Sequence, residues 1–315
     1  MIQRFWSKTW VRVMVYSGWT TLFFLMSLIW TYPGDALVEE VSEAVRKSGA
    51  LAHFDARDAS ISGLGVALEG VEIVTESGDA NLPWRIDRVR VGLASFTTDV
   101  QSAALNFDVE AYGGSISGLV GKGALRVDLD GVELGRAMPL QKIIPTGLAG
   151  AAHGQVAMSY GEKVMRTLQG TIDLTLRSAA IGPGDVPIPG FGSSLSLPKA
   201  TVGDLPLKIG ISSGELELEP FKVTGGDVEL AGEGTMRLVF SRIMASSMDL
   251  EFDVRPTDKL KATQEGKNLL TALDPKSPLL PRRIKRAFSK SGWLGVSVGG
   301  RLRNPRVQVR RSNVK

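Results

Sequence analysis

Apolar and polar residues alternate strictly through much of the chain beyond residue 50. Leu105, Phe107 and Val109 are separated by polar residues at positions 106 and 108. The same alternation returns at 125–130, 172–177, 215–219 and 250–255. Because successive side chains of a strand point to opposite faces, each stretch has one apolar face and one charged face. Antiparallel sheets show this pattern, whereas buried parallel strands are apolar throughout. We therefore predict a mainly β protein with antiparallel strands.

Glycine-rich turn signals separate these strands, and they occur at 112–115, 121–123, 130–131, 225–227 and 299–300. Two stretches, 107–129 and 221–238, look like copies of one unit. Each has a strand, a Gly-Gly turn, a second strand, a glycine pair (Gly121 and Gly123, or Gly232 and Gly234) and a third strand. Residues 294–309 resemble a third, weaker copy. Hairpin repeats of this kind predict an elongated sheet that grows edgewise.

An uncharged run from Val13 to Tyr32 precedes the strands. As a helix it is about 30 Å long, the thickness of a bilayer's hydrocarbon core. Aromatic residues lie at both ends, and Arg4, Lys8 and Arg12 come before it. We predict a transmembrane helix at 13–32, a cytoplasmic segment 1–12, and a body across the membrane. The predicted anchor residues are Val13, Trp19, Leu22, Phe23, Phe24, Leu25, Leu28, Trp30 and Tyr32.

The two alternatives to an anchor are a cleaved signal peptide and a buried core helix. A signal peptide has an apolar region of about 7–15 residues and ends at small residues. This run is longer and ends at the bulky Trp30, Tyr32 and Pro33. These features favour an uncleaved anchor.

The body divides into four predicted segments. Residues 33–49 hold an amphipathic helix, capped by Asp35, that packs on the first strands or, alternatively, touches the membrane surface. Residues 50–177 and 207–315 form two β-repeat halves. The Pro- and Gly-rich segment 178–206 joins them as a loop or edge, because proline cannot donate to a strand ladder. Further short helices are predicted at 132–144, 258–273 and 282–289.

Charge is distributed unevenly along the 315 residues. Residues 35–275 carry 22 basic and 33 acidic residues, whereas 276–315 carry 12 basic residues and no acid. The predicted basic contact surface comprises Arg282, Arg283, Lys285, Arg286, Lys290, Arg301, Arg303, Arg306, Arg310 and Arg311. It could meet an anionic bilayer or an acidic protein, or it could be a solvated edge that blocks aggregation. With the body across a membrane, we expect no nucleic acid partner.

Catalytic motifs are absent from the sequence. There is no cysteine, and the two histidines, His53 and His153, lack the spacing of a metal-binding pair. No Gly-x-Ser-x-Gly motif occurs. The run GLVGKG at 118–123 lies between strands, where hairpin glycines explain it better than a phosphate loop. We predict a protein that is not an enzyme and has neither a cofactor nor a metal.

The chain resembles the type II secretion system protein N family. The resemblance rests on the basic N-terminus and single anchor, the run YPGDAL at 32–37 with the acidic helix after it, the Gly-Gly hairpins, and GGRLRNPR at 299–306. It implies an inner-membrane accessory protein with a periplasmic β-domain, whose partners are platform proteins or the secretin. The hairpin repeats are also similar to AsmA-like proteins, whose curved sheets offer an apolar groove for lipid.

Two function classes follow from these observations. In the first, the protein is an assembly scaffold of a secretion apparatus, with sheet edges and the basic tail as contact surfaces. In the second, it binds or conducts phospholipid along an apolar surface. A sheet that is apolar on one side must cover that side with helices, a second sheet, another subunit or acyl chains.

Overall fold

The structure of the protein is a computed structural model. It describes residues 34–36, 38–39, 42–43, 53–62, 65–77, 80–93, 104–137, 147–161, 167–187, 194–239, 245–272, 274, 282–302 and 304–314. The predicted anchor at 13–32 lies outside these residues. Among the helices that are described, none combines the length and the apolar character needed to cross a bilayer.

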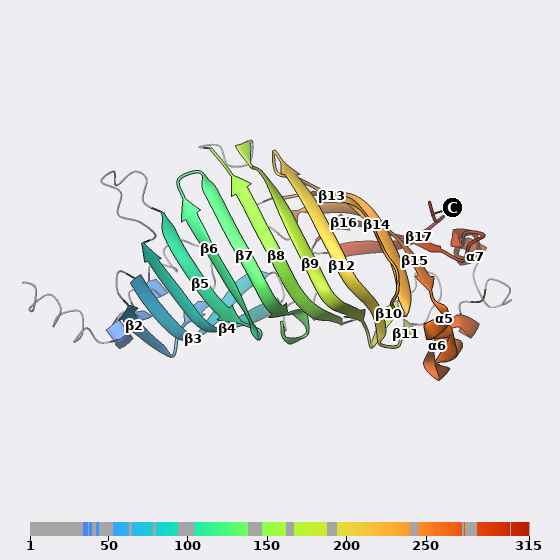
Figure 1. Cartoon of the computed structure of the whole chain (residues 1–315), viewed down its shortest axis with the longest axis horizontal. Helices are drawn as coiled ribbons and strands as arrows, with labels where there is room; N and C mark the ends of the chain where they lie inside the picture. The colour runs from blue at the N-terminus through green and yellow to red at the C-terminus, as the bar shows by residue number, and fades with distance from the viewer. Residues whose placement is uncertain are drawn as a thin grey trace, which may run out of the picture.

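One long antiparallel sheet forms almost the whole body. Figure 1 shows it as a bent band in which β5–β9 and β12 lie side by side, while β13–β17 turn behind them. Its strands are β1 (His53–Asp55), β2 (Asp58–Ser62), β3 (Gly65–Ser77), β4 (Ala80–Leu93), β5 (Leu105–Ala111), β6 (Gly114–Gly121), β7 (Ala124–Glu133), β8 (Leu148–Ser159), β9 (Gln169–Ile181), β12 (Ala200–Ser212), β13 (Glu215–Val223), β14 (Val228–Arg237), β15 (Ser247–Pro256), β16 (Leu294–Arg301) and β17 (Asn304–Arg310).

The order of the strands follows the chain. From β3 to β17 the strands of this sheet lie side by side in the order in which they occur along the chain. Of the described strands between them, β10 (Gly184–Pro187) and β11 (Ser194–Leu197) form a separate two-stranded hairpin. Both β1 and β2 pair with β3. The prediction of a mainly β, antiparallel body is therefore confirmed.

Short helices lie near the two ends of the sheet. Described residues between 34 and 43 are helical, in agreement with the predicted amphipathic helix. At the other end, α5 (Asp258–Ala262) and α6 (Gln264–Ala272) occupy the predicted 258–273 helix, with a break at Thr263. The helix α7 (Arg282–Ala287) confirms the helix expected at 282–289. The 3-10 turn η3 covers Leu134–Arg136.

The helix predicted at 132–144 is wrong at its start. Val132 and Glu133 belong to β7, and Val132 is buried opposite Ala152 of β8. The neighbouring Asp130-Gly131 signal is not a hairpin turn but a β-bulge, at which Gly131 has a φ of 70° and the register to β8 shifts. The bulge returns Val132 to the apolar face, so the strand continues. Residues 138–146 lie outside the described residues.

Two other glycine signals lie within strands. Gly232 and Gly234 are inside β14, which runs without interruption along β15. Gly299 and Gly300 are inside β16, and the chain turns after Arg301. The predicted third strand of the second repeat therefore does not exist as a separate element. The signals at 112–114, 121–123 and 225–227 do connect strands, as predicted.

The segment 178–206 is only partly a connection. Its first residues complete β9, its last residues begin β12, and these two central strands pair with each other. Pro206 is tolerated inside β12 because the ladder to β13 covers only Ile209–Ser212. At Pro206 the strand is therefore paired with β9 alone. Sequence composition alone overlooked this one-sided pairing.

Candidate functional site

An apolar row crosses the sheet from β2 to β17 near the middle of the strands. Residues directly opposite each other in a ladder lie on the same face, so the pairings define the row. Its members are Ile61, Val66, Val91, Phe107, Gly118, Val127, Val156, Ile172, Ile209, Leu218, Gly234, Leu250, Val298 and Val307. No polar side chain interrupts it.

A second apolar row runs beside the first, from β4 to β17. It comprises Leu93, Leu105, Val120, Leu125, Met158, Gly170, Ile211, Leu216, Met236, Met248, Gly300 and Pro305. Two side chains of this row, Leu93 and Leu105, are 43% and 44% exposed. We refer to these two rows and the residues beside them on the same side of the sheet as the apolar face.

The apolar face is buried in part. In the second row Ile211 and Met248 are buried, and a larger buried group lies toward the other end of the strands. There Val132, Ala152, Leu176 and Leu205 form a further row within a core cluster that extends to Leu230 of β14. By contrast, every member of the row from Ile61 to Val307 is half-buried or exposed. A band of hydrocarbon surface thus remains accessible along the described sheet. Exposed apolar patches of this extent mark binding surfaces.

The opposite face of the sheet is polar. One row there consists of Arg90, Asp108, Ser117, Asp128, Gln155, Asp173 and Lys208. Beside it, Arg88 lies between two carboxylates, 2.9 Å from Glu69 and 3.6 Å from Glu110. Such exposed ion pairs contribute little to the free energy of unfolding, but their charged side chains keep this face of the sheet hydrated. Leu119 also lies on this face and is 45% exposed. The two faces therefore differ in the continuous apolar rows, which the polar face lacks.

Phenylalanine side chains cover two glycines of the apolar face. Phe107 lies opposite Gly118, and Phe221 lies opposite Gly232, which has Phe252 on its other side. Gly118 follows Phe107 in the chain by the same number of residues as Gly232 follows Phe221. A Cβ added at Gly232 would lie 2.7 Å from the Phe252 ring and 2.9 Å from the Phe221 ring. This cross-strand packing is what the two sequence repeats have in common.

Most of the predicted basic residues lie at the C-terminal end. Arg282 and Arg286 of α7, Lys290, Arg306 and Arg311 are exposed, and Lys285 is half-buried. Arg301 is also exposed, at the end of β16. Arg303 lies outside the described residues, and the side chain of Arg283 is not described. The structure thus gathers these cations on the last two strands and the helix beside them.

Arg310 does not belong to the contact surface. Its side chain is 17% exposed, and its Nη2 lies 3.1 Å from Asp253 and 3.3 Å from Glu251 of β15. It crosses the intervening strand at Gly295, which lies opposite both Arg310 and Asp253. Because the guanidinium neutralises a buried carboxylate, Arg310 stabilises the sheet. The sequence placed Arg310 in the basic contact surface because nothing local reveals its partner two strands away.

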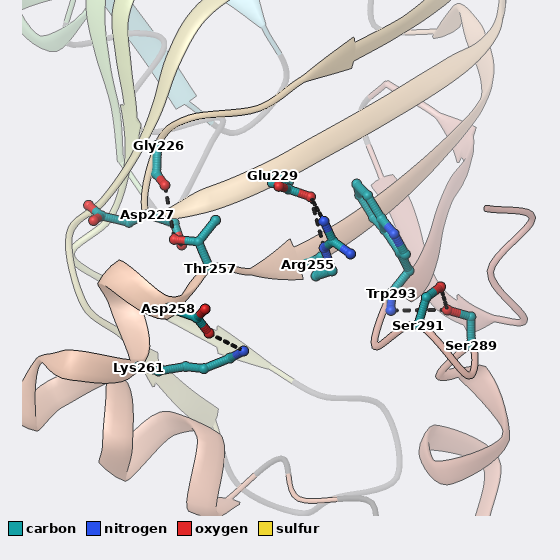
Figure 2. Close-up of polar contacts among 10 residues, drawn as sticks. All are labelled: Gly226, Asp227, Glu229, Arg255, Thr257, Asp258, Lys261, Ser289, Ser291 and Trp293. Carbon is teal, nitrogen blue, oxygen red and sulfur yellow. Dashed lines mark hydrogen bonds and ion pairs between the residues drawn. The ribbon is translucent and has the colours of Figure 1, made fainter. Parts of the chain in front are cut away.

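A buried tryptophan anchors the C-terminal strands. Trp293 is 1% exposed and lies between two cations, with Arg255 4.9 Å and Lys222 5.3 Å from its ring centre. Figure 2 shows Arg255 held toward the ring by Glu229 of β14. Sequence reasoning missed this cluster, since no local pattern links residues 229, 255 and 293.

The turn between β13 and β14 is held by side chains. In Figure 2, Thr257 lies against this turn and donates to the carbonyl oxygens of Gly226 and Asp227. Asp227 also accepts hydrogen bonds from the Thr201 hydroxyl at 2.6 Å and the Thr201 amide at 2.9 Å. These two bonds lower the pKa of Asp227 below its usual value.

The histidine with described surroundings supports local structure. His153 Nδ1 lies 2.8 Å from the Asp130 carboxylate and 3.3 Å from the Gly131 amide, both at the bulge of β7. His53 lies in β1, at the other end of the sheet. Within the described ranges, no group of three or more His, Asp or Glu residues is arranged to hold a metal ion.

Comparisons with known proteins found no match, whether to family models, to curated proteins or to solved structures.

Proposed function

We propose that this protein is a non-enzymatic lipid-binding protein whose apolar face holds the acyl chains of phospholipids. The observation that supports the proposal is the row from Ile61 to Val307, which has an apolar residue or glycine in every strand from β2 to β9 and from β12 to β17 and no buried member. Each CH₂ group moved from water onto such a surface contributes about 0.8 kcal/mol. A bent sheet of this composition is also what the resemblance to AsmA-like proteins implies.

The proposal assigns no chemical step to the protein. Polar head groups would remain at the margin of the sheet, where the strands end and charged residues begin. The predicted anchor at 13–32 would tether the body to the bacterial inner membrane, with the bulk of the chain in the periplasm. Lipid would then be within reach of the first strands.

Lipid analysis of the purified full-length chain tests the proposal. The expected result is that a phospholipid with a photoreactive group in its acyl chain is crosslinked, in membranes, to residues of the apolar row, and that mass spectrometry of the purified chain finds it there. Ile172→Glu places a carboxylate in the apolar row and is expected to lower bound phospholipid about tenfold, because charge is costly in hydrocarbon.

Thr171→Glu is the matched control, since Thr171 precedes Ile172 in β9 and is exposed on the polar face. It is expected to retain wild-type lipid. Equal lipid content in the two variants, or no lipid on the folded wild-type protein, would contradict the proposal. Circular dichroism checks that both variants keep the β fold.

A second candidate is the assembly role implied by the resemblance to type II secretion system protein N. The observation that favours it is the gathering of exposed cations at the C-terminal end of the sheet. In this role the protein would contact platform proteins or the secretin. Co-purification with either partner, lost when the exposed Arg282, Arg286, Lys290 and Arg311 are all changed to glutamate, is the expected result. Retained co-purification with these four substitutions would contradict a C-terminal contact.

A further inference from the structure

The last strand of the sheet has a free edge. β17 pairs on one side with β16 and is the terminal strand of the order. Residues 304–308 are all exposed. An unpaired row of backbone N–H and C=O groups is a template for a further strand.

Pro305 identifies which backbone groups face outward. In an antiparallel pair, hydrogen-bonded and non-hydrogen-bonded residues alternate. Pro305 has no N–H, so it belongs at a position whose nitrogen faces away from β16. By alternation, the N–H and C=O groups of Val307 and Val309 also face away from β16, and they are unpaired in the sheet.

The other end of the sheet is covered. The hydroxyl of Ser42, in the N-terminal helix, donates to the Phe54 carbonyl of β1 at 2.9 Å. Val38 of the same helix packs on the core cluster around Leu68 and Val71. Described residues of the N-terminal segment thus contact β1, whereas β17 is exposed along 304–308.

Two arginines of β17 have equivalent surroundings but different partners. Arg310 faces Asp253 across Gly295, and Arg306 faces Asp249 across Gly299. Arg310 is ion-paired, whereas Arg306 is exposed and makes no ion pair with any residue that the structure describes. The segment 276–315 contains no acid that could neutralise it. Arg306 is thus available to an acidic residue from outside.

We propose that the free edge of β17 accepts a strand from a partner protein in which acidic and apolar residues alternate. The apolar residues of that strand would extend the rows that end at Pro305 and Val307, and an acidic residue would lie opposite Arg306. A second copy of β17 fits poorly, because residues 304–310 contain no acidic residue that could lie opposite Arg306. The proposal does not depend on lipid binding, since it concerns backbone groups and the polar face.

A synthetic peptide tests the inference on the full-length chain in detergent micelles. The probe copies residues 213–219 of this chain, SGELELE, which has the required alternation, and the comparison peptide replaces each Glu with Lys. Fluorescence anisotropy is expected to show binding of the Glu peptide that weakens with salt, and weaker binding of the Lys peptide. Hydrogen exchange is expected to slow at the amides of Val307 and Val309.

Charge reversal makes the test specific. Arg306→Glu is expected to weaken binding of the Glu peptide about fivefold and to strengthen binding of the Lys peptide by a similar factor. Arg177→Glu, at an exposed position of the central strand β9, is the matched control and is expected to change neither. Val307→Pro removes an outward N–H and is expected to abolish binding.

Three results would overturn the proposal. One is that the wild-type chain and Arg306→Glu bind the Glu peptide and the Lys peptide equally well. Another is peptide binding without protection of the Val307 and Val309 amides. The third is a concentration-dependent dimer, lost in Val307→Pro, which would assign the edge to a second copy. None of these readouts measures lipid, so they are independent of the lipid analysis of the Ile172 variant.

Discussion

At the scale of single residues, glycines allow large side chains to cross the sheet. Gly232 leaves room for the rings of Phe221 and Phe252, and an added Cβ at Gly118 would lie 2.6 Å from the ring of Phe107. At Gly232 the position without a Cβ joins β13 and β15, which are not direct neighbours. The missing side chain is therefore part of the packing and is not merely a turn signal.

Gly232→Ala is predicted to lower the free energy of unfolding by about 1–3 kcal/mol. The new Cβ would lie within 3 Å of the rings of Phe221 and Phe252, and relieving this overpacking forces those rings to move. Urea denaturation followed by circular dichroism measures the change.

Gly210→Ala is the matched control for this prediction. Gly210 lies in β12, and nothing comes within 4 Å of an added Cβ there. The substitution is expected to leave the free energy of unfolding unchanged or to raise it by about 0.4–1 kcal/mol through the unfolded state. Equal destabilisation by both substitutions would show that the rings do not constrain Gly232.

Arg310 shows why a charged residue cannot be assigned to a surface by type alone. Asp253 is 5% exposed, and a buried carboxylate without a cation is strongly destabilising. The structure supplies that cation from the last strand, and Asn313 adds a hydrogen bond to the neighbouring Glu251. Arg306, four residues before Arg310, lies on the same face of β17 and has no acidic partner among the residues that the structure describes.

At the scale of elements, side chains replace a missing strand ladder. The first half of β12 is paired with β9 but not with β13. Thr201 and Asp227 connect that half to the β13–β14 turn through the hydroxyl–carboxylate bond and a backbone bond of 2.7 Å from the Asp227 amide to the Thr201 carbonyl. The turn is thereby held against a central strand.

Thr201→Val is predicted to destabilise the protein in a pH-dependent way. The hydrogen bonds from Thr201 hold the folded-state pKa of Asp227 below its unfolded value of about 3.9. Their contribution is therefore complete above that pH and is lost as the pH falls through the lower, folded-state pKa. The difference in free energy of unfolding between wild type and variant should be largest near neutral pH and should shrink below about pH 4.

Urea titrations at a series of pH values measure that difference. Thr171→Val, on the exposed polar face of β9, is the control and should show no such pH dependence. A difference between wild type and Thr201→Val that is constant down to pH 2 would contradict the role assigned to the Asp227 carboxylate.

At the scale of the whole molecule, the sheet is nearly one-dimensional. From β3 to β17 each strand pairs with its neighbours in the sheet, and the order follows the chain. The free energy of unfolding in such arrangements is close to the sum of the contributions of the individual units and of the interfaces between neighbouring units. Distant parts of this sheet are therefore expected to open independently of one another.

Gly232→Ala is accordingly predicted to speed hydrogen exchange in β13–β15 while leaving exchange in β5–β7 unchanged. The substitution disturbs the rings of β13 and β15, and many strands separate them from β5. Hydrogen-exchange mass spectrometry of wild type and variant measures the effect strand by strand. Faster exchange throughout the sheet would show instead that the molecule unfolds as one cooperative unit.

The apolar face exists only at this largest scale. Each strand contributes only a few of its residues; β7, for example, contributes Leu125, Val127, Leu129 and Val132. Stacking the strands in register converts separate side chains into a continuous band from β2 to β17. The proposed lipid-binding function thus depends on register more than on any one residue.

The sequence by itself determined the class of fold, the two-faced strands and several helices. These features follow from local periodicity, because side chains of a strand alternate between faces whatever the partners are. It also located the turns at 112–114 and 225–227, where glycine takes a positive φ. The division into two repeat halves and the membrane anchor remain predictions from the same local evidence.

Only the tertiary structure decided which strands pair, where glycines lie within strands, and which cations are free. The bulge at Gly131, the central position of β12 and the Asp253–Arg310 pair all depend on contacts between residues distant in sequence. Periodicity excludes a one-residue shift of register, which would move the apolar side chains to the other face, but it does not choose among even-numbered shifts or say which strands pair. Register nonetheless made one continuous apolar face from many short patterns, and it left Arg306 exposed while Arg310 is paired.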